Sequence, residues 1–191
     1  VDNATGLSVM LEVARLWMEQ DPRPRRSAIF LATAGEEAGS AGALEYVAKP
    51  PVPLAATRLA LNFHAYLPFG RTRDFVLDGA DRTTLWPLIR HTTARFGAEA
   101  KPTTTGSPDT TSESAIFTRA GVPAFTMKPG ADYSAEPARK TLLAEEFMAT
   151  RWHQPGDEFH EDWDLSGMEQ VVHLGLEIGK QRFAGGFGAV V

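Results

Sequence analysis

Five residues of the chain have side chains suited to metal or acid–base chemistry, and each stands at the border of an expected helix or strand. They are Asp2, Glu36, Glu37, His64 and His153. Carboxylate oxygens and imidazole nitrogens bind zinc, and a nearby carboxylate that does not bind the metal can act as a general base. A hydrolytic zinc site needs that combination together with an open position for water. Taken together, the five residues indicate metal-dependent hydrolysis.

Taken one at a time, the same residues have simpler explanations. An acid directly before a helix, such as Asp2, is commonly a capping or turn residue. Two adjacent acids such as Glu36 and Glu37 are usually exposed on a solvated loop. A lone His after a strand, such as His64, is more often hydrogen-bonded structure than a ligand.

The loop that carries His153 has an acid four residues further on, Asp157. This acid either orients the imidazole, as outer carboxylates do in zinc sites, or belongs to an ordinary turn. Wide separation of the candidate residues along the chain is expected, because loops from one edge of an α/β sheet converge in space. The joint pattern is therefore harder to dismiss than any single residue.

The elements around the Glu36–Glu37 pair predict where it lies. Residues 28–33 are short and almost continuously apolar, which predicts a central strand buried on both faces in a sheet covered by helices. The two acids would then stand at the carboxyl end of that strand, where open α/β sheets bind ligands. A stretch of small residues follows, and a helix is expected over residues 43–47.

Hydrophobic spacing and turn residues predict the remaining elements. The alternation of helices and apolar strands favours an α/β fold, three-layer α/β/α with a central mixed, mostly parallel sheet, in a single domain over residues 1–191. Residues 101–111 and 128–139 are expected to be irregular. Further helices are expected at 5–19, 82–96, 114–120, 142–148 and 166–178, and further strands at 59–63, 75–77 and 122–127.

Composition limits the classes of function. The chain has 191 residues, of which 43% are hydrophobic and 23% are charged, with a net charge of −5 and no cysteine. These are ordinary globular values, and no block of like charge indicates a nucleic-acid partner or an acidic membrane. No apolar run approaches the ~20 residues that span a bilayer. Thiolate metal sites and disulfides are excluded.

Four segments, in order, carry a resemblance to a known family: Asp-Asn-Ala-Thr-Gly at 2–6, Gly-Glu-Glu at 35–37, Leu-Asn-Phe-His at 61–64 and Trp-His-Gln-Pro-Gly-Asp at 152–157. Over nearly its whole length the chain resembles the two-zinc aminopeptidases of metallopeptidase family 28. Supporting similarity lies at Pro68–Asp74, Phe117–Ala124 and Asp164–Gly167.

The resemblance implies a role for each matching residue. Asp2 would bridge two zinc ions, and Glu37 and His153 would bind the first zinc together with it. Glu36 would be the general base for a metal-activated water. The implied reaction is hydrolysis of peptide bonds, with removal of N-terminal residues from a peptide substrate.

The chain departs from the family pattern in three places. His64 stands where the family has Asp, and Ser112-Glu113-Ser114 stands where close relatives read Ser-Asp-His. The family's upstream His-x-Asp motif, which supplies a ligand to the second zinc, would lie before Val1. The second site keeps only Asp2 and His64, so we expect one zinc to bind well and the second weakly or not at all.

The upstream segment in relatives also supplies strands of the sheet, and we expect these N-terminal strands to be missing here. A strand edge would then be exposed or paired with another copy of the chain, which is compatible with a homo-oligomer. Periplasmic or extracellular location is expected from the family resemblance alone.

Two alternatives to the peptidase remain open. A degenerate or truncated relative would keep the fold and act as a binding or assembly module, as the departures at His64 and Ser114 suggest. A different amide or acyl substrate is the other alternative, since fold does not determine substrate.

Overall fold

A computed structural model describes residues 1–103, 112–181 and 187–190, the last four through their backbone alone. Over these residues the strands are β1 (Ala28–Phe30), β2 (Thr57–Phe63), β3 (Asp74–Asp78), β4 (Glu99–Lys101), β5 (Ala124–Pro129) and β6 (Phe187–Val190). The helices are α1 (Ala4–Met18), α2 (Ala41–Ala48), α3 (Trp86–Arg95), α4 (Glu113–Arg119), α5 (Pro137–Thr150) and α6 (Ser166–Gly179).

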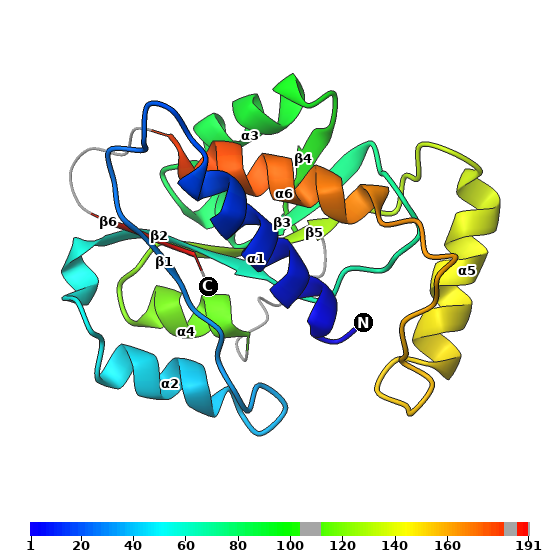
Figure 1. Ribbon diagram of the computed structural model, residues 1–191, viewed down its shortest axis with the longest axis horizontal. Helices are drawn as coiled ribbons and strands as arrows, with labels where there is room; N and C mark the ends of the chain where they lie inside the picture. Colours follow the sequence, from blue (N-terminus) through cyan, green and yellow to red (C-terminus); the bar gives the residue numbers. More distant parts are fainter. Residues whose placement is uncertain (104–111, 182–186, 191) are drawn as a thin grey trace.

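The strands form one sheet in the order β1-β6-β2-β5-β3-β4. All neighbouring pairs are parallel except β3 and β5, which run antiparallel. Helices α1, α3 and α6 cover one face of the sheet, and α2 and α4 cover the other (Figure 1). The predicted three-layer α/β/α fold with a mostly parallel sheet is confirmed.

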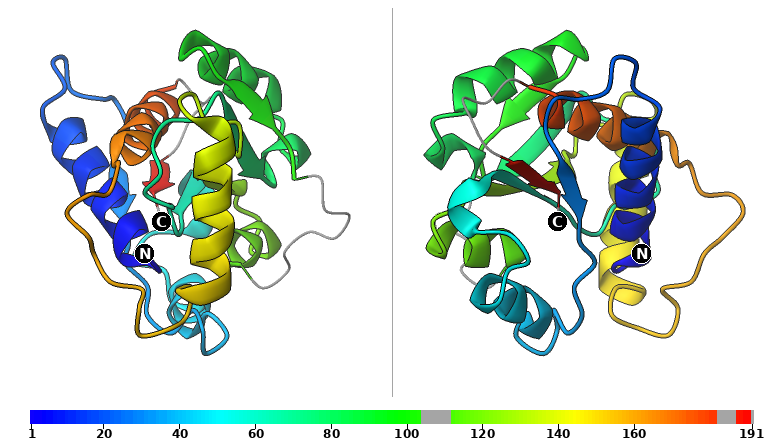
Figure 2. Two further views of the ribbon diagram at one scale, coloured as in Figure 1. Left: turned by 90° about the vertical axis from the view of Figure 1, so that its right-hand side faces the viewer. Right: turned by 60° about the vertical axis from the view of Figure 1, so that its left-hand side comes forward.

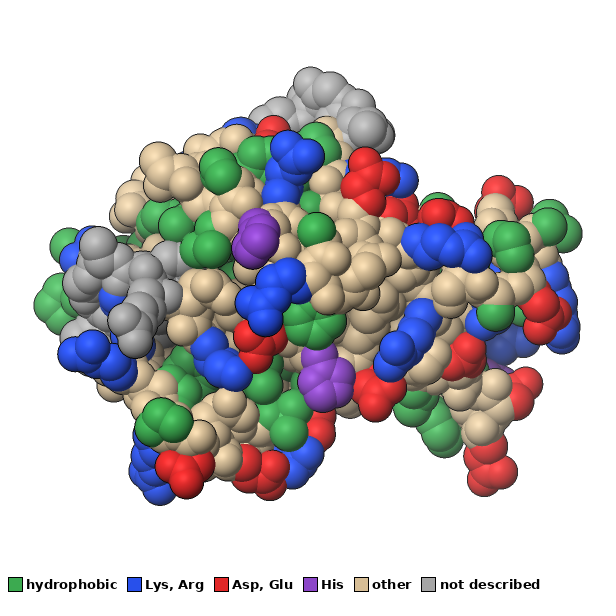
Figure 3. All heavy atoms as spheres, turned by 90° about the horizontal axis from the view of Figure 1, so that it is seen from above, with side chains coloured by type: hydrophobic (Ala, Val, Ile, Leu, Met, Phe, Trp, Pro, Cys, Tyr) green, Lys and Arg blue, Asp and Glu red, His purple; other side chains and the backbone are tan. Residues whose placement is uncertain are grey.

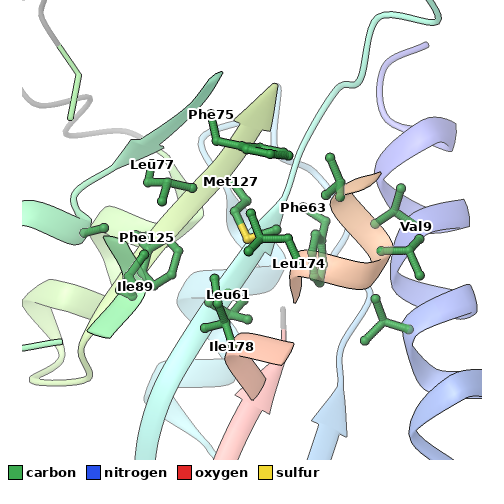
Figure 4. Packing of buried hydrophobic residues seen from close by; sticks show 14 of the residues in the cluster. Val9, Leu61, Phe63, Phe75, Leu77, Ile89, Phe125, Met127, Leu174 and Ile178 are labelled. Carbon is green, nitrogen blue, oxygen red and sulfur yellow. The ribbon is translucent and has the colours of Figure 1, made fainter. Parts of the chain in front are cut away.

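Strand β2 lies inside the sheet and divides its side chains between the two faces, because successive residues of a strand point to opposite sides. Leu59, Leu61 and Phe63 belong to the large core beneath α1 and α6, which Figure 4 shows from close by. Ala60 belongs to the smaller core under α4, with Phe117. Burying a side chain such as Leu61 contributes about 1.5–3 kcal/mol. The strand thereby fixes the position of His64, the residue that follows it.

Strand β1 differs from its prediction. Its three residues are only half-buried, and among the described strands it pairs with β6 alone, so it lies at an edge of the sheet. The expectation of a central strand buried on both faces was wrong, because the C-terminal β6 takes the place between β1 and β2. The Glu36–Glu37 turn therefore follows an edge strand.

Other helices and strands also differ from their predicted bounds. The helix expected to start at residue 82 begins at Trp86, after a short 3-10 turn at Ala80–Arg82. Strands β4 and β6 were not expected, and β4 takes the start of the predicted loop 101–111, whose later part lies outside the described residues.

Helix α5 is longer than expected and stands to one side of the two helical layers (Figures 1 and 2). Phe147 anchors it by packing edge-on against Phe69, with ring centroids 6.2 Å apart. Lys140 forms an ion pair of 2.8 Å with Asp164 at the start of α6. The chain after α5 then returns to the sheet carrying His153.

The surface mixes charges of both signs. On the face that Figure 3 shows, Lys and Arg side chains lie among Asp and Glu side chains without a large patch of one sign. In the part of the chain that the structure describes, no helix is long and apolar enough to cross a membrane.

Candidate metal centre

The start of α1 is fastened to the end of β2 by Asn3. Its side-chain oxygen accepts hydrogen bonds from the backbone N–H groups of Gly6 (3.2 Å) and Ala65 (2.9 Å). Its amide donates to the carbonyl of Phe63 at 3.2 Å. Asn3 is thus the helix cap that orients the segment carrying Asp2.

Gly6 allows this close approach. A Cβ at Gly6 would lie 2.2 Å from the Asn3 side-chain oxygen and 2.3 Å from the Phe63 carbonyl oxygen. Thr5 adds a second tie, since its hydroxyl donates to the carbonyl of Val1 and accepts from the backbone N–H of Tyr66. The Asp-Asn-Ala-Thr-Gly motif therefore locks a helix end against a strand end.

The turn that carries the two glutamates is closed by its own backbone. Gly35 has a φ of +73°, a conformation that glycine adopts readily. The Glu36 carbonyl accepts from the N–H of Ser40 at 2.9 Å, and the Ala34 carbonyl accepts from the N–H of Gly42 at 2.9 Å. These bonds hold the turn that carries both glutamates, just before α2 begins at Ala41.

His153 lies in the loop after α5. Its own backbone has a φ of +57°, and its ring stacks at a tilt against Trp152, with centroids 5.0 Å apart. The side chain is half exposed. The loop turns this imidazole toward Asp2 and Glu37.

Among the described hydrogen bonds, none joins the carboxylate of Asp157 to His153. This carboxylate instead accepts from the backbone nitrogens of Val1 and Asp2, the latter at 2.9 Å. The sequence left open whether this acid orients His153 or belongs to an ordinary turn, and its backbone N–H does close a turn by donating to the carbonyl of Gln154 at 2.9 Å. It positions the backbone of Asp2.

Asp2, Glu37 and His153 meet at one point. Nε2 of His153 lies 3.0 Å from Oδ2 of Asp2 and 3.0 Å from Oε1 of Glu37. The three ligand atoms all lie within 4.8 Å of one another. A tetrahedral zinc with bonds of about 2.0–2.1 Å separates its ligand atoms by roughly 3.3 Å. The three side chains therefore fit the spacing that one zinc ion requires.

His64 faces the other oxygen of the same carboxylate. Its Nε2 lies 3.6 Å from Oδ1 of Asp2. The Asp2 side chain is only 10% exposed and stands between the two imidazoles. His64 is not part of the three-residue group, so its role as a ligand stays a prediction.

A cavity of about 280 Å³ opens beside this group, at the ends of β1 and β2 and the start of α1. Four carboxylates line it, those of Asp2, Glu36, Glu37 and Glu113. Burial raises the pKa of Glu36 above its ordinary value, and the nearby carboxylates add to this effect while His64 opposes it. A carboxylate with a raised pKa is better matched to proton transfer near neutral pH.

Comparison with protein families shows that residues 1–176 match Peptidase family M28. The chain belongs to peptidase family M28. Comparison with curated proteins and with solved structures gave no match. Membership of family M28 implies metal-dependent hydrolysis of peptide bonds, and peptidases of this family generally use zinc. The oxygen and nitrogen donors of Asp2, Glu37 and His153 suit that metal.

Glu113 lines the same cavity, and sequence reasoning left it without a role. It lies at the start of α4, is only 7% exposed and lines the cavity with Glu36. The carboxylate of Glu113 accepts a hydrogen bond from the hydroxyl of Thr33, which lies three residues before Glu36. The only sequence signal was its place in the Ser-Glu-Ser segment, one of the departures from the family pattern.

Ser114, the other unusual residue of that segment, has a structural setting. Its buried hydroxyl lies 3.0 Å from the hydroxyl of Thr126, which also accepts a 3.2 Å hydrogen bond from the side-chain amide of Asn62. The hydroxyl of Ser112 lies 3.1 Å away. This network joins α4 to strands β2 and β5 rather than facing the metal group.

Proposed function

We propose that the protein is a zinc-dependent aminopeptidase that removes N-terminal residues from peptides. The observation that carries the proposal is the convergence of Asp2, Glu37 and His153 beside Glu36, whose carboxylate makes no hydrogen bond or ion pair with the residues that the structure describes. This convergence supports a metal site with an adjacent base, the arrangement that hydrolysis requires.

Asp2, Glu37 and His153 would hold the zinc, which when bound supplies a Lewis acid and acidifies water. Glu36 would accept a proton from the water that attacks the peptide carbonyl carbon. As the carbon–nitrogen bond breaks, the same carboxyl group would return the proton to the leaving amine. Its partial burial and raised pKa support both transfers.

The charge of the cavity supports an aminopeptidase over other peptidases. Its ionisable lining consists of four carboxylates and the imidazole of His64. Zinc would offset Asp2 and Glu37, which leaves Glu36 and Glu113 to attract a positive group. The free α-ammonium of a peptide is such a group, and its attraction is strengthened where water is partly excluded.

The test compares two substrates that differ only at the amino group. Purified protein with added zinc is assayed with L-leucine 4-nitroanilide and with its N-acetyl derivative. We expect turnover of the free amine alone, loss of turnover with a chelator and its recovery on adding zinc. Equal turnover of the acetylated compound would contradict the aminopeptidase proposal.

The alternative of a catalytically inactive binding or assembly module is favoured by one observation, the imidazole of His64 where the family has Asp. Folded, zinc-loaded protein with no turnover of any aminoacyl or acyl amide would establish that alternative.

A further inference from the structure

A second cavity, of about 250 Å³, lies next to the first and shares His64 with it. It lies between the end of β5 and helix α5, and its wall includes Trp152, the neighbour of His153. Drug-sized ligands occupy roughly 300–1,000 Å³, so this space suits one side chain of a substrate. It adjoins the metal group through His64 and Trp152.

The walls of the second cavity are mostly apolar, with Leu67, Tyr133, Met148 and Trp152 among the lining residues. Lys128, on β5, also lines it. Among the described residues that line this cavity there is no Asp or Glu. The first cavity has four carboxylates, so two adjoining spaces differ in the sign of their charge.

An acid close to this cavity is already engaged. Asp74, whose charge contributes to the raised pKa of Tyr133, forms a 3.0 Å ion pair with Lys101 and accepts from the backbone N–H of Asp132. No ion pair of Lys128 is seen among the described residues. The positive charge of Lys128 is therefore available to a ligand.

We propose that the second cavity receives the side chain of the substrate's N-terminal residue, and that Lys128 selects a carboxylate at its end. This inference rests on the proposed aminopeptidase function. The α-ammonium group would lie in the acid-lined cavity, and the methylene groups of a glutamyl side chain would contact the apolar wall. A lysyl side chain would bring a second cation beside Lys128, and like charges in a partly desolvated pocket repel strongly.

The test uses three 4-nitroanilides, of L-glutamate, its neutral near-isostere L-glutamine and L-lysine. We expect kcat/KM for the glutamyl compound to exceed that for the glutaminyl compound about tenfold or more, with the lysyl compound lowest. Lys128→Met should bring the glutamyl-to-glutaminyl ratio close to one, and Lys128→Glu should invert the order of the charged substrates. The matched control is Lys49→Met, at the exposed position that follows α2, which should leave all ratios unchanged.

A binding measurement separates this inference from the proposed function. Calorimetry with zinc-loaded protein should show that L-glutamate binds at least fivefold more tightly than L-glutamine, and that Lys128→Met removes the difference. If this preference is found without turnover of any substrate, the proposed function fails and the role of Lys128 stands. If glutamine and glutamate bind equally, or if Lys128→Met leaves their ratio unchanged, the inference is overturned.

Discussion

Nε2 of His153 lies 3.0 Å from Oδ2 of Asp2, although 151 positions separate the two residues in the chain. The loop after α5 contributes to this contact in two ways. It supplies the imidazole of His153, and through Asp157 it holds the backbone of Asp2. One loop thus provides one candidate ligand and positions the backbone of another.

Asp157→Ala should weaken zinc binding without removing any of the three proposed ligands. The backbone of Asp2 would lose its acceptor, and loss of such supporting contacts typically lowers metal affinity by about 10–100-fold. Competition with a fluorescent zinc chelator measures the change. The matched control is Glu158→Ala at the exposed neighbouring position, and equal affinities of the two variants would refute the positioning role of Asp157.

Gly6→Ala should destabilise the fold at the start of α1. The new methyl group would lie within 2.3 Å of both the Asn3 side chain and the Phe63 carbonyl, so helix and strand must move apart. Overpacking of this kind lowers the free energy of unfolding by about 1–3 kcal/mol. Urea unfolding tests it against Gly156→Ala, where the nearest atom would be 3.8 Å away. Equal free energies of unfolding for the two variants would contradict this prediction.

The protein should bind one zinc per chain tightly. The three-residue group satisfies one ion, whereas among the candidate ligands that the structure describes a second ion would have His64 and the far oxygen of Asp2 alone. Elemental analysis after dialysis should give a ratio of zinc to protein chain near one, and His64→Ala should change this ratio little. Two tightly held ions per chain would contradict this prediction.

Asp164 should contribute a pH-dependent stabilisation. Its hydrogen bond from Lys140, followed by that from Ser166, lowers its pKa in the folded protein. A lowered pKa stabilises the fold above the unfolded-state value of about 3.9, and this contribution is lost as the pH falls below it. Because Asp164 is 44% exposed, solvent screening limits the effect to about 1 kcal/mol or less.

Unfolding of Asp164→Asn and wild-type protein at pH 7 and at pH 2.5 tests this contribution. The difference in their free energies of unfolding should be present at pH 7 and should shrink at pH 2.5. Asp162→Asn, two residues upstream on the exposed surface, serves as the control. A difference for Asp164→Asn that is the same at both pH values would exclude the ionic contribution.

The elements with strong apolar patterns were predictable from the sequence. The helical spacing of Leu7, Met10, Leu11, Ala14 and Trp17 predicted α1, although its buried face includes Val9 and Val13 while Leu7 and Leu11 are exposed. The apolar β2 was placed within two residues of its start. Strand β4 reads Glu-Ala-Lys and has no apolar pattern, so only its pairing with β3 reveals it.

The edge position of β1 could not be read from its residues. An apolar run of that length suits a central strand, and only the long-range pairing with β6 shows otherwise. The length of helix α5 was underestimated because the helix packs through few residues, such as Phe147, and leaves Leu142 and Met148 exposed. A weak apolar stripe predicts a short helix.

The candidate metal group was predictable as a set of residues but not as a geometry. Asp2, Glu37 and His153 stand in recognisable motifs, and the structure brings them together. The acids that support or surround them, Asp157 and Glu113, depend on contacts over 155 and 80 positions of sequence, which no local pattern encodes.

The adjacent pair Glu36 and Glu37 offers the most direct test of the proposed mechanism, because the two neighbouring glutamates have different proposed roles. Zinc content and kcat/KM for an aminoacyl 4-nitroanilide are measured on Glu36→Gln, on Glu37→Gln and on Glu45→Gln, an exposed control on α2. Glu36→Gln should keep its zinc and lose about 10²–10⁴-fold in kcat/KM. Glu37→Gln should lose zinc as well. If Glu36→Gln hydrolyses the substrate as fast as the control, Glu36 is not the base and the proposed mechanism is wrong.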